Sequence, residues 1–201
     1  MQKPFSAAAD RNKDPILNVL IEYLLPNKRL LEIGSGTGQH AVYMAKHLPF
    51  LQWTTSDQKI NHIGIQMWLE DAKLPNVDGP ESFKVGEDKV PGTGRYDYIY
   101  SANTLHIMPW SECELLFDHL PECIDREGLV FFYGPYKYDG EYTSESNEAF
   151  DRSLQSQNPL SGIRNFEDIK DALESRGFSL VRDHQMPANN QLLVFCANQT
   201  M

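Results

Sequence analysis

The run Glu32-Ile33-Gly34-Ser35-Gly36-Thr37-Gly38 sets the fold class of this chain. The apolar residues 29–33 before it predict a short buried strand, and apolar residues at helical spacing over 41–48 predict a helix after it. A glycine-rich turn that leaves a strand and opens a helix is the setting of a nucleotide-binding turn. Its glycines allow positive φ and close approach of the backbone to a ligand. The free N–H groups at the start of the helix point back at the turn.

On either side of this run, strand-like and helix-like segments alternate. Strands are expected at 29–33, 51–55, 83–85, 96–101 and 129–133, followed by a closing antiparallel pair at 178–182 and 191–196. Helices are expected from an Asp14-Pro15 start, over 60–72, from a Ser111/Glu114 capping box to about Leu120, around 145–156, and from Asn165 to Gly177. This alternation predicts an α/β fold with a mostly parallel sheet.

The composition limits the class of protein. Lys and Arg number 18 and Asp and Glu number 28, so the net charge is −10, which disfavours non-specific binding to nucleic acid. The 201 residues suit a single domain, 1–201. Three cysteines without a CxxC pair, and no visible metal-ligand cluster, predict neither a disulfide framework nor a metal site. In the absence of a long apolar run or a secretory signal, we expect no membrane span and a cytoplasmic location, with the nucleus left open.

The spacing of the glycines separates three interpretations of the turn. A dinucleotide fingerprint, G-x-G-x-x-G, would place its third glycine at position 39, which is Gln39. The observed G-x-G-x-G, with Glu32 two residues before the first glycine, resembles motif I of class I S-adenosylmethionine-dependent methyltransferases. In the third interpretation the glycines only let the strand and the helix pack. The motif favours the second interpretation, in which Glu32, Gly34, Ser35, Gly36 and Gly38 bind the cofactor.

Two acidic residues further along extend the expected cofactor site. Asp57 ends the second strand, where a carboxylate can accept hydrogen bonds from both ribose hydroxyls or can cap the next helix. The Glu87-Asp88 pair follows the expected third strand, where an acid can lie near the adenine amino group; we favour Asp88 for this role. Surface turns are rich in Asp in any case, so an ordinary turn is the alternative for Asp88.

Five further segments carry a closer resemblance: PFSAAADRNKDPI (4–16), LEIGSGTGQHAVYMA (31–45), SANTLHIMPW (101–110), YGPYKYDGEYTSESNEAFD (133–151) and MPANNQLLVF (186–195). Together they are similar to a family of small class I methyltransferase-like proteins of unknown function that includes methyltransferase-like 26. The resemblance covers nearly the whole chain. It implies a Rossmann-like class I methyltransferase fold, with six parallel strands and one antiparallel strand and helices on both faces, and binding of S-adenosyl-L-methionine. It implies no acceptor.

Residues near the expected strand ends are candidates for cofactor and catalytic roles. Arg11 is expected to pair with the methionine carboxylate from an N-terminal segment, 1–28, that covers the cofactor. Asn103 follows the fourth strand and is expected to border the methyl donor. His106 is the candidate general base, because its ordinary pKa is near neutral. His40 lies in the first turn of a helix, where the dipole disfavours a charged ring, and is expected to shape the pocket.

The acceptor side is expected to be aromatic and polar. Tyr133 and Tyr136, after the fifth strand, and Asn189 and Asn190, in the last turn, are the candidates for an acceptor pocket, with residues 134–164 as a lid. Lid packing and a plain hairpin turn are the alternatives.

The sequence therefore predicts methyl transfer to an unknown acceptor, with a small molecule or a protein side chain favoured over nucleic acid. Two other functions stay open: a protein that binds S-adenosylmethionine or a protein partner without catalysis, and an NAD-type oxidoreductase, which Gln39 disfavours.

Overall fold

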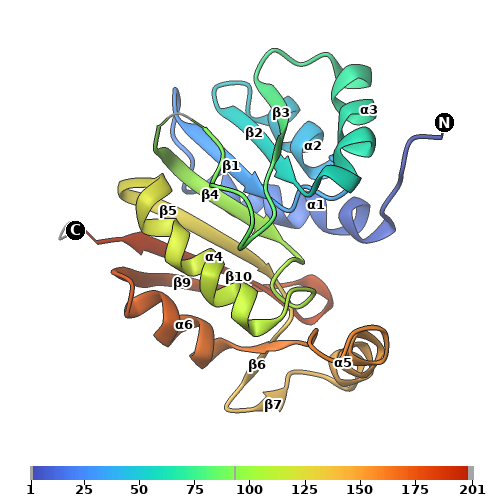
Figure 1. Ribbon diagram of the computed structural model, residues 1–201, viewed down its shortest axis with the longest axis vertical. Helices are drawn as coiled ribbons and strands as arrows, with labels where there is room; N and C mark the ends of the chain where they lie inside the picture. The colour runs from blue at the N-terminus through green and yellow to red at the C-terminus, as the bar shows by residue number, and fades with distance from the viewer. Residues whose placement is uncertain (1, 93, 199–201) are drawn as a thin grey trace.

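The structure is a computed structural model that describes residues 2–92 and 94–198. Its centre is one seven-stranded sheet in the order β3-β2-β1-β4-β5-β10-β9 (Figure 1). Its strands are β1 (Arg29–Ile33), β2 (Gln52–Asp57), β3 (Val77–Ser82), β4 (Tyr96–Ala102), β5 (Ile124–Gly134), β9 (Phe178–Met186) and β10 (Asn190–Ala197). β10 alone runs antiparallel to its neighbours, between β5 and β9. The prediction of six parallel strands and one antiparallel strand is confirmed.

Helices cover both faces of the sheet (Figure 1). α1 (Ala7–Leu20) and α2 (Gln39–His47) pack on one face, and α4 (Trp110–Cys123) and α6 (Phe166–Glu174) pack on the other. α3 (His62–Ala72) follows the short helix η1 (Lys59–Asn61) and contacts β3 and α2. Successive strand residues point to opposite faces. Phe131 therefore enters the core under α1 and α2, while Phe132 enters the core under α4 and α6.

The sheet order places the site. The chain steps from β1 outward through β2 to β3 and then returns to the other side of β1 with β4. At this reversal the loops after β1 and β4 leave the sheet in opposite directions and open a crevice at the carboxyl ends of the strands. β1 pairs with β2 up to Ile33 and Ser56, so the glycine-rich turn starts beside the end of β2.

The prediction that Asp14-Pro15 opens the first helix is wrong. α1 begins at Ala7, and the Ser6 hydroxyl caps it by accepting a hydrogen bond from the Ala9 amide at 3.2 Å. Pro15 lies inside the helix. Its missing N–H removes one backbone hydrogen bond, and the complete burial of Ile16 and Leu20 on the same helix offsets that loss.

The prediction of the third strand at 83–85 is also wrong, since that strand lies at Val77–Ser82. It is an edge strand with mostly half-exposed or exposed residues, so it carries no apolar pattern and tolerates Gly79-Pro80. Phe83 is buried in the core rather than paired in the sheet.

Other boundaries differ from the sequence prediction because long-range packing extends or replaces local signals. α4 begins at Trp110 after Pro109 and has no side-chain cap, so the capping box at Ser111 and Glu114 does not form. α5 (Glu145–Gln157) confirms the helix expected around 145–156. A small second sheet of β6 (Tyr136–Tyr138), β7 (Glu141–Tyr142) and β8 (Arg164–Asn165) was not predicted.

None of the helices described is both long and apolar enough to cross a lipid bilayer.

Candidate functional site

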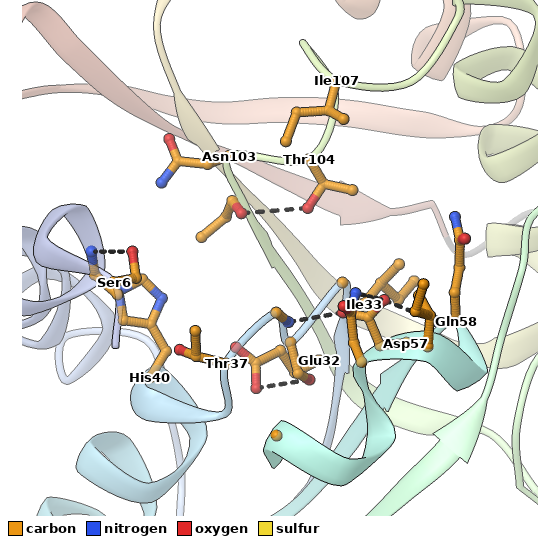
Figure 2. A pocket seen from close by; sticks show the side chains of 18 of the residues that line it. Ser6, Glu32, Ile33, Thr37, His40, Asp57, Gln58, Asn103, Thr104 and Ile107 are labelled. Atoms are coloured by element: carbon orange, nitrogen blue, oxygen red, sulfur yellow. Dashed lines mark hydrogen bonds between the residues drawn. The ribbon is translucent and has the colours of Figure 1, made fainter. Parts of the chain in front are cut away.

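A cavity of about 740 Å³ opens at the carboxyl ends of β1, β2 and β4 (Figure 2). Its floor is the glycine-rich turn, its sides are η1, α3 and the loops after β3 and β4, and the N-terminal segment runs along it. The side chains that define it include Ser6, Glu32, His40, Asp57, Gln58, Asn61, Phe83, Val85, Asn103, Thr104, Ile107 and Glu112. Its place at the topological switch point of an α/β sheet is where such folds bind ligands.

The glycine-rich turn packs closely against the protein at Gly34 and is open at Gly36. The amides of Gly34 and Ser35 both donate to the Ser56 carbonyl, each at 3.0 Å. A Cβ on Gly34 would lie 2.7 Å from the Thr104 hydroxyl oxygen. Gly36 has φ +58°, yet a Cβ there would meet no protein atom within 4 Å, because this part of the turn faces the cavity. The turn is therefore tight toward the protein and open toward a ligand.

Asp57 ties the end of β2 to the turn. One carboxylate oxygen accepts a hydrogen bond from the Gly36 amide at 2.7 Å, and the other accepts from the Gln58 amide at 2.7 Å and the Asn61 side chain at 2.8 Å. Two carboxylate oxygens offer about four acceptor positions, so roughly one stays available for a ligand.

Glu32 lies at the bottom of the cavity. Its carboxylate accepts hydrogen bonds from the Trp53 indole at 3.0 Å and the Ser35 hydroxyl at 3.1 Å. Burial raises its pKa to about 7, and the two hydrogen bonds oppose that shift. Near neutral pH this carboxyl group is therefore poised between its charged and neutral forms.

His40 borders the cavity as a neutral ring. Burial lowers its pKa to about 4. Its Nε2 lies 2.6 Å from the Asn12 side-chain oxygen, an acceptor, so Nε2 carries the proton, and Nδ1 accepts from the Tyr100 hydroxyl at 3.2 Å. The expectation that His40 shapes the pocket fits this placement.

The N-terminal segment lies along the cavity and is anchored on two helices. The Trp68 indole donates to the Pro4 carbonyl at 2.8 Å, and a Cβ on Gly64 would lie 2.8 Å from the Pro4 ring. Lys3 stacks its ammonium over the Trp68 ring. Gln39 exchanges two hydrogen bonds with the backbone of Ser6. We refer to residues 2–6 as the N-terminal strap.

The structure brings six of the predicted cofactor residues together at the cavity: Glu32, Gly34, Ser35, Gly36, Asp57 and Asn103. The other three do not line it. Gly38 has φ +86° and caps α2, where a Cβ would lie 3.1 Å from the Ile65 backbone, so it serves helix packing. Arg11 is exposed on α1. Asp88 turns back on its own loop and accepts from the Lys84 amide at 2.9 Å and the Ser82 hydroxyl at 3.1 Å.

The predicted catalytic and acceptor residues lie behind the cavity wall. His106 is buried against the Phe150 ring of α5, 5.3 Å between ring centroids, and burial lowers its pKa to about 4. Tyr133 and Tyr136 are buried, and the Tyr136 hydroxyl donates to the Phe132 carbonyl at 3.2 Å.

Neither the last turn nor the expected lid reaches the cavity. Asn189 lies in the turn before β10 and Asn190 is the first residue of that strand; the Asn189 carbonyl accepts from the Asn147 side chain at 2.9 Å. No residue of the segment 134–164, all of which the structure describes, lines the cavity.

Residues 161–164 instead hold the loop after β4 from behind. The Gly162 amide donates to the His106 carbonyl at 2.9 Å, and the Ser161 hydroxyl donates to the Ile107 carbonyl at 2.6 Å. The Arg164 guanidinium donates to the carbonyls of Leu105 and Met108. Four consecutive carbonyls of the loop after β4, from Leu105 to Met108, are thus bound by one segment.

Several cavity residues do not follow from the motifs of the sequence. Gln58 and Asn61 come one and four residues after Asp57, so the end of β2 is a usable signal for them. Thr104 lies between Asn103 and His106, and Ile107 directly follows His106, so both are within the SANTLHIMPW segment that already holds two candidates. Ser6 and Glu112 reach the cavity only through tertiary packing. In residues 2–92 and 94–198, no group of three or more His, Cys, Asp and Glu side chains is arranged to hold a metal ion.

Solved structures with the same fold include proteins described as methyltransferases. The apo enzyme SibL has a TM-score of 0.81 at 19% identity, over 96% of this chain and 56% of that one. An O-methyltransferase family protein from Burkholderia thailandensis has a TM-score of 0.78 at 14% identity, over 96% and 58%. Human N-acetylserotonin methyltransferase, in complex with S-adenosylmethionine, has a TM-score of 0.78 at 15% identity, over 96% and 53%.

At these identities the likeness shows the fold, which is the Rossmann-like class I methyltransferase fold. This chain spans little more than half the length of those enzymes. The profile of the family described as Protein of unknown function (DUF938) matches residues 3–197, and the chain therefore belongs to that family.

Proposed function

We propose that this protein is an S-adenosylmethionine-dependent methyltransferase that binds its cofactor in the cavity above the glycine-rich turn. The observation that carries the proposal is the pairing of an open Gly36 with the Asp57 carboxylate at the end of β2. Within its family we place the chain beside methyltransferase-like 26, on the strength of the five sequence segments. The acceptor is proposed to be a small molecule or a protein side chain, in keeping with the net charge of −10.

The charge of the cavity supports this cofactor over a dinucleotide. Glu32, Asp57 and Glu112 line it, and neither Lys nor Arg does among the residues described. S-adenosylmethionine brings a sulfonium and an ammonium group, both cationic, which this lining favours. The pyrophosphate of NAD would enter an acidic cavity without a basic side chain to offset its charge.

The cavity residues have distinct proposed roles. Asp57 accepts from a ribose hydroxyl through its remaining acceptor position. Phe83 and Val85 form an apolar wall suited to the adenine ring. Asn103, at the end of β4 with φ +58°, is held by its amide to the Tyr133 carbonyl at 2.8 Å and directs its side chain toward the cavity (Figure 2). Arg11 and Asp88 would need a local rearrangement to reach a ligand.

Chemistry at this site is chiefly alignment and removal of water. Bound S-adenosylmethionine supplies an electrophilic methyl group: the acceptor's lone pair forms the new bond, the C–S bond breaks, and sulfur keeps its electron pair. The residues of the chain orient both partners and exclude water. Where the acceptor loses a proton, we propose His106 as the base. Its depressed pKa keeps the ring neutral at pH 7, and the loop after β4 would have to move for this ring to reach the cavity, which it does not line.

Calorimetric titration with S-adenosylmethionine, S-adenosylhomocysteine and NADH tests the proposal. Micromolar affinity for the first two, about −8 kcal/mol, with no heat from NADH, is the expected result. Absence of binding to either sulfur compound would contradict it. The protein is then incubated with methyl-labelled S-adenosylmethionine and either a metabolite extract or a protein extract, and transfer of the label is measured. Binding without transfer in either extract would favour the second candidate, a cofactor-binding or interaction module, for which the enclosed position of His106 is the supporting observation.

A further inference from the structure

Large apolar side chains stand exposed around the mouth of the cavity. Ile60 is 85% exposed, Ile63 is 60% exposed and Ile107 is 57% exposed, and all three line the cavity. They come from opposite sides of it, η1 and α3 on one side and the loop after β4 on the other. Single exposed apolar residues are ordinary, but three around one opening mark a place where apolar surface is covered by a ligand. We call Ile60, Ile63 and Ile107 the isoleucine rim.

The charged groups at this mouth are acidic. Glu32 and Asp57 already accept hydrogen bonds from the protein, whereas among the described residues no hydrogen bond or ion pair fixes the Glu112 side chain on the first turn of α4. The basic residues that neighbour the lining in sequence do not line the cavity themselves, although Lys84 lies close enough to Glu112 for their charges to interact. Lys3 pairs with Asp71 and Lys84 pairs with Glu87, and exposed Lys59 does not line the cavity.

We propose that the methyl acceptor is a small apolar molecule, neutral or cationic, that reaches the cavity across the isoleucine rim, with Glu112 facing its cationic end. The inference rests on the proposed function. Carboxylate and phosphate acceptors are disfavoured because an anion at the rim would meet Glu112 and no basic side chain among the described lining residues. The isoleucine rim gives such an acceptor apolar surface to cover, which removes that surface from water.

The N-terminal strap favours a small molecule over a protein surface. Gln2, Pro4 and Ser6 line the cavity, and the anchors on Trp68 and Gln39 hold the strap along one side. The acceptor therefore has to pass between the strap and Ile107. A flat protein surface would have to displace the strap first.

Three matched probes test the inference on protein saturated with S-adenosylhomocysteine. Tyramine, 4-ethylphenol and 3-(4-hydroxyphenyl)propionate share a phenol ring and differ in carrying a cation, no charge or an anion. Saturation-transfer NMR and competition calorimetry are expected to rank the amine first and the acid last, with the acid at least tenfold weaker than the amine. Equal binding of the acid, or no binding of all three, would overturn the inference.

Variants assign the effect to the named residues. Glu112→Gln is expected to remove the preference for the amine over the neutral probe. Ile107→Ser and Ile60→Ser should each weaken the binding of tyramine and of 4-ethylphenol at least threefold. Val181 is an exposed apolar residue on β9 that does not line the cavity, so Val181→Ser should leave the binding of all probes unchanged. Loss of binding in Val181→Ser would mean that the rim effects are non-specific and would also contradict the assignment.

The same samples separate this inference from the proposed function. Binding of S-adenosylhomocysteine without any probe binding leaves the proposed function standing and overturns the acceptor class. Absence of S-adenosylhomocysteine binding overturns the proposed function, and the probes are then measured on the unliganded protein, where the same ranking is still required. A lysine-containing peptide that binds in place of all three probes would assign the mouth to a protein acceptor instead.

Discussion

The Gly36 amide donates a 2.7 Å hydrogen bond to the Asp57 carboxylate, which joins the loop after β1 to the end of β2 beside the backbone hydrogen bonds to Ser56. Asp57 thereby has two functions that separate measurements can distinguish: it shapes the turn, and it presents a remaining acceptor position to the cavity. The same carboxylate also binds Gln58 and Asn61, which links the turn to η1.

Asp57→Ala is expected to weaken binding of S-adenosylmethionine at least tenfold and to lower the free energy of unfolding by about 1–3 kcal/mol, because three donors lose their partner. Calorimetry and urea denaturation measure the two effects. Asp88→Ala is the matched control. The Asp88 carboxylate also accepts hydrogen bonds from a local amide and a hydroxyl, but Asp88 does not line the cavity. The free energy of unfolding should therefore fall in this variant while the affinity for S-adenosylmethionine stays unchanged. Unchanged affinity in Asp57→Ala would remove this residue from the binding site.

Gly36→Val is expected to abolish cofactor binding, because the new side chain points into open space that the ligand would fill. The positive φ adds a strain of about 1–2 kcal/mol. Gly140→Val is the control, since Gly140 also has positive φ and a Cβ there would meet no protein atom within 4 Å, yet it lies between β6 and β7. Equal loss of affinity in both variants would show that strain alone explains the result.

Glu32→Gln is expected to change how stability depends on pH. The native pKa of Glu32, about 7, lies above its ordinary 4.5, so its contribution is fully present below about pH 4.5 and is lost as the pH rises through about 7. Relative to wild type, the variant should gain roughly 3 kcal/mol between pH 4.5 and pH 8. Urea denaturation at stepped pH measures this difference.

His40 changes the stability with pH in the opposite direction to Glu32, and it does so in both wild type and variant. Subtracting the wild-type free energy of unfolding at each pH therefore leaves the contribution of Glu32. The native pKa of His40, about 4, lies below its ordinary 6.5, so its contribution is present above pH 6.5 and is lost as the pH falls through about 4. A difference between Glu32→Gln and wild type that does not vary with pH would contradict the buried, titrating carboxyl group.

Arg164→Met is expected to loosen the cavity wall from a distance. The guanidinium donates to the carbonyls of Leu105, Met108 and Leu160, so its removal leaves three acceptors to find water. Hydrogen exchange over 103–109 should accelerate, and affinity for S-adenosylhomocysteine should fall severalfold. Arg152→Met on α5, which removes an exposed ion pair with Glu148, should change neither. Unaltered exchange in Arg164→Met would show that other contacts suffice to hold the loop.

His106→Gln is expected to leave the affinity for S-adenosylhomocysteine within twofold of wild type, since His106 does not line the cavity. Methyl transfer, once an acceptor is known, should fall by about 10²–10⁴ if the residue acts as the base. An undiminished transfer rate would exclude that role, and a large loss of affinity would place His106 closer to the cofactor than the structure does.

Local patterns were sufficient for the strand, turn and helix around the glycine run. Hydrophobic periodicity and glycine chemistry act over a few residues, so β1, the turn and α2 could be predicted, and Asp57 followed from the end of β2. The edge strand β3 could not be predicted, because its residues are largely exposed and its pairing with β2 is a contact between distant segments. The start of α1 at Ala7, after the Ser6 cap, could not be predicted because Pro15 is compatible with both a first turn and a helix interior.

Residues close together in the chain were enough to establish the fold class, the glycine-rich turn and the carboxylate that faces it, because each of these depends on short-range patterns. Folding alone brings the N-terminal strap along the cavity, sets 161–164 behind the loop after β4, and turns His106 and Asp88 away from the cavity. Each of these depends on which of many equally suitable hydrogen-bond partners comes near in space. That choice is made by the packing of distant segments, which no local pattern records.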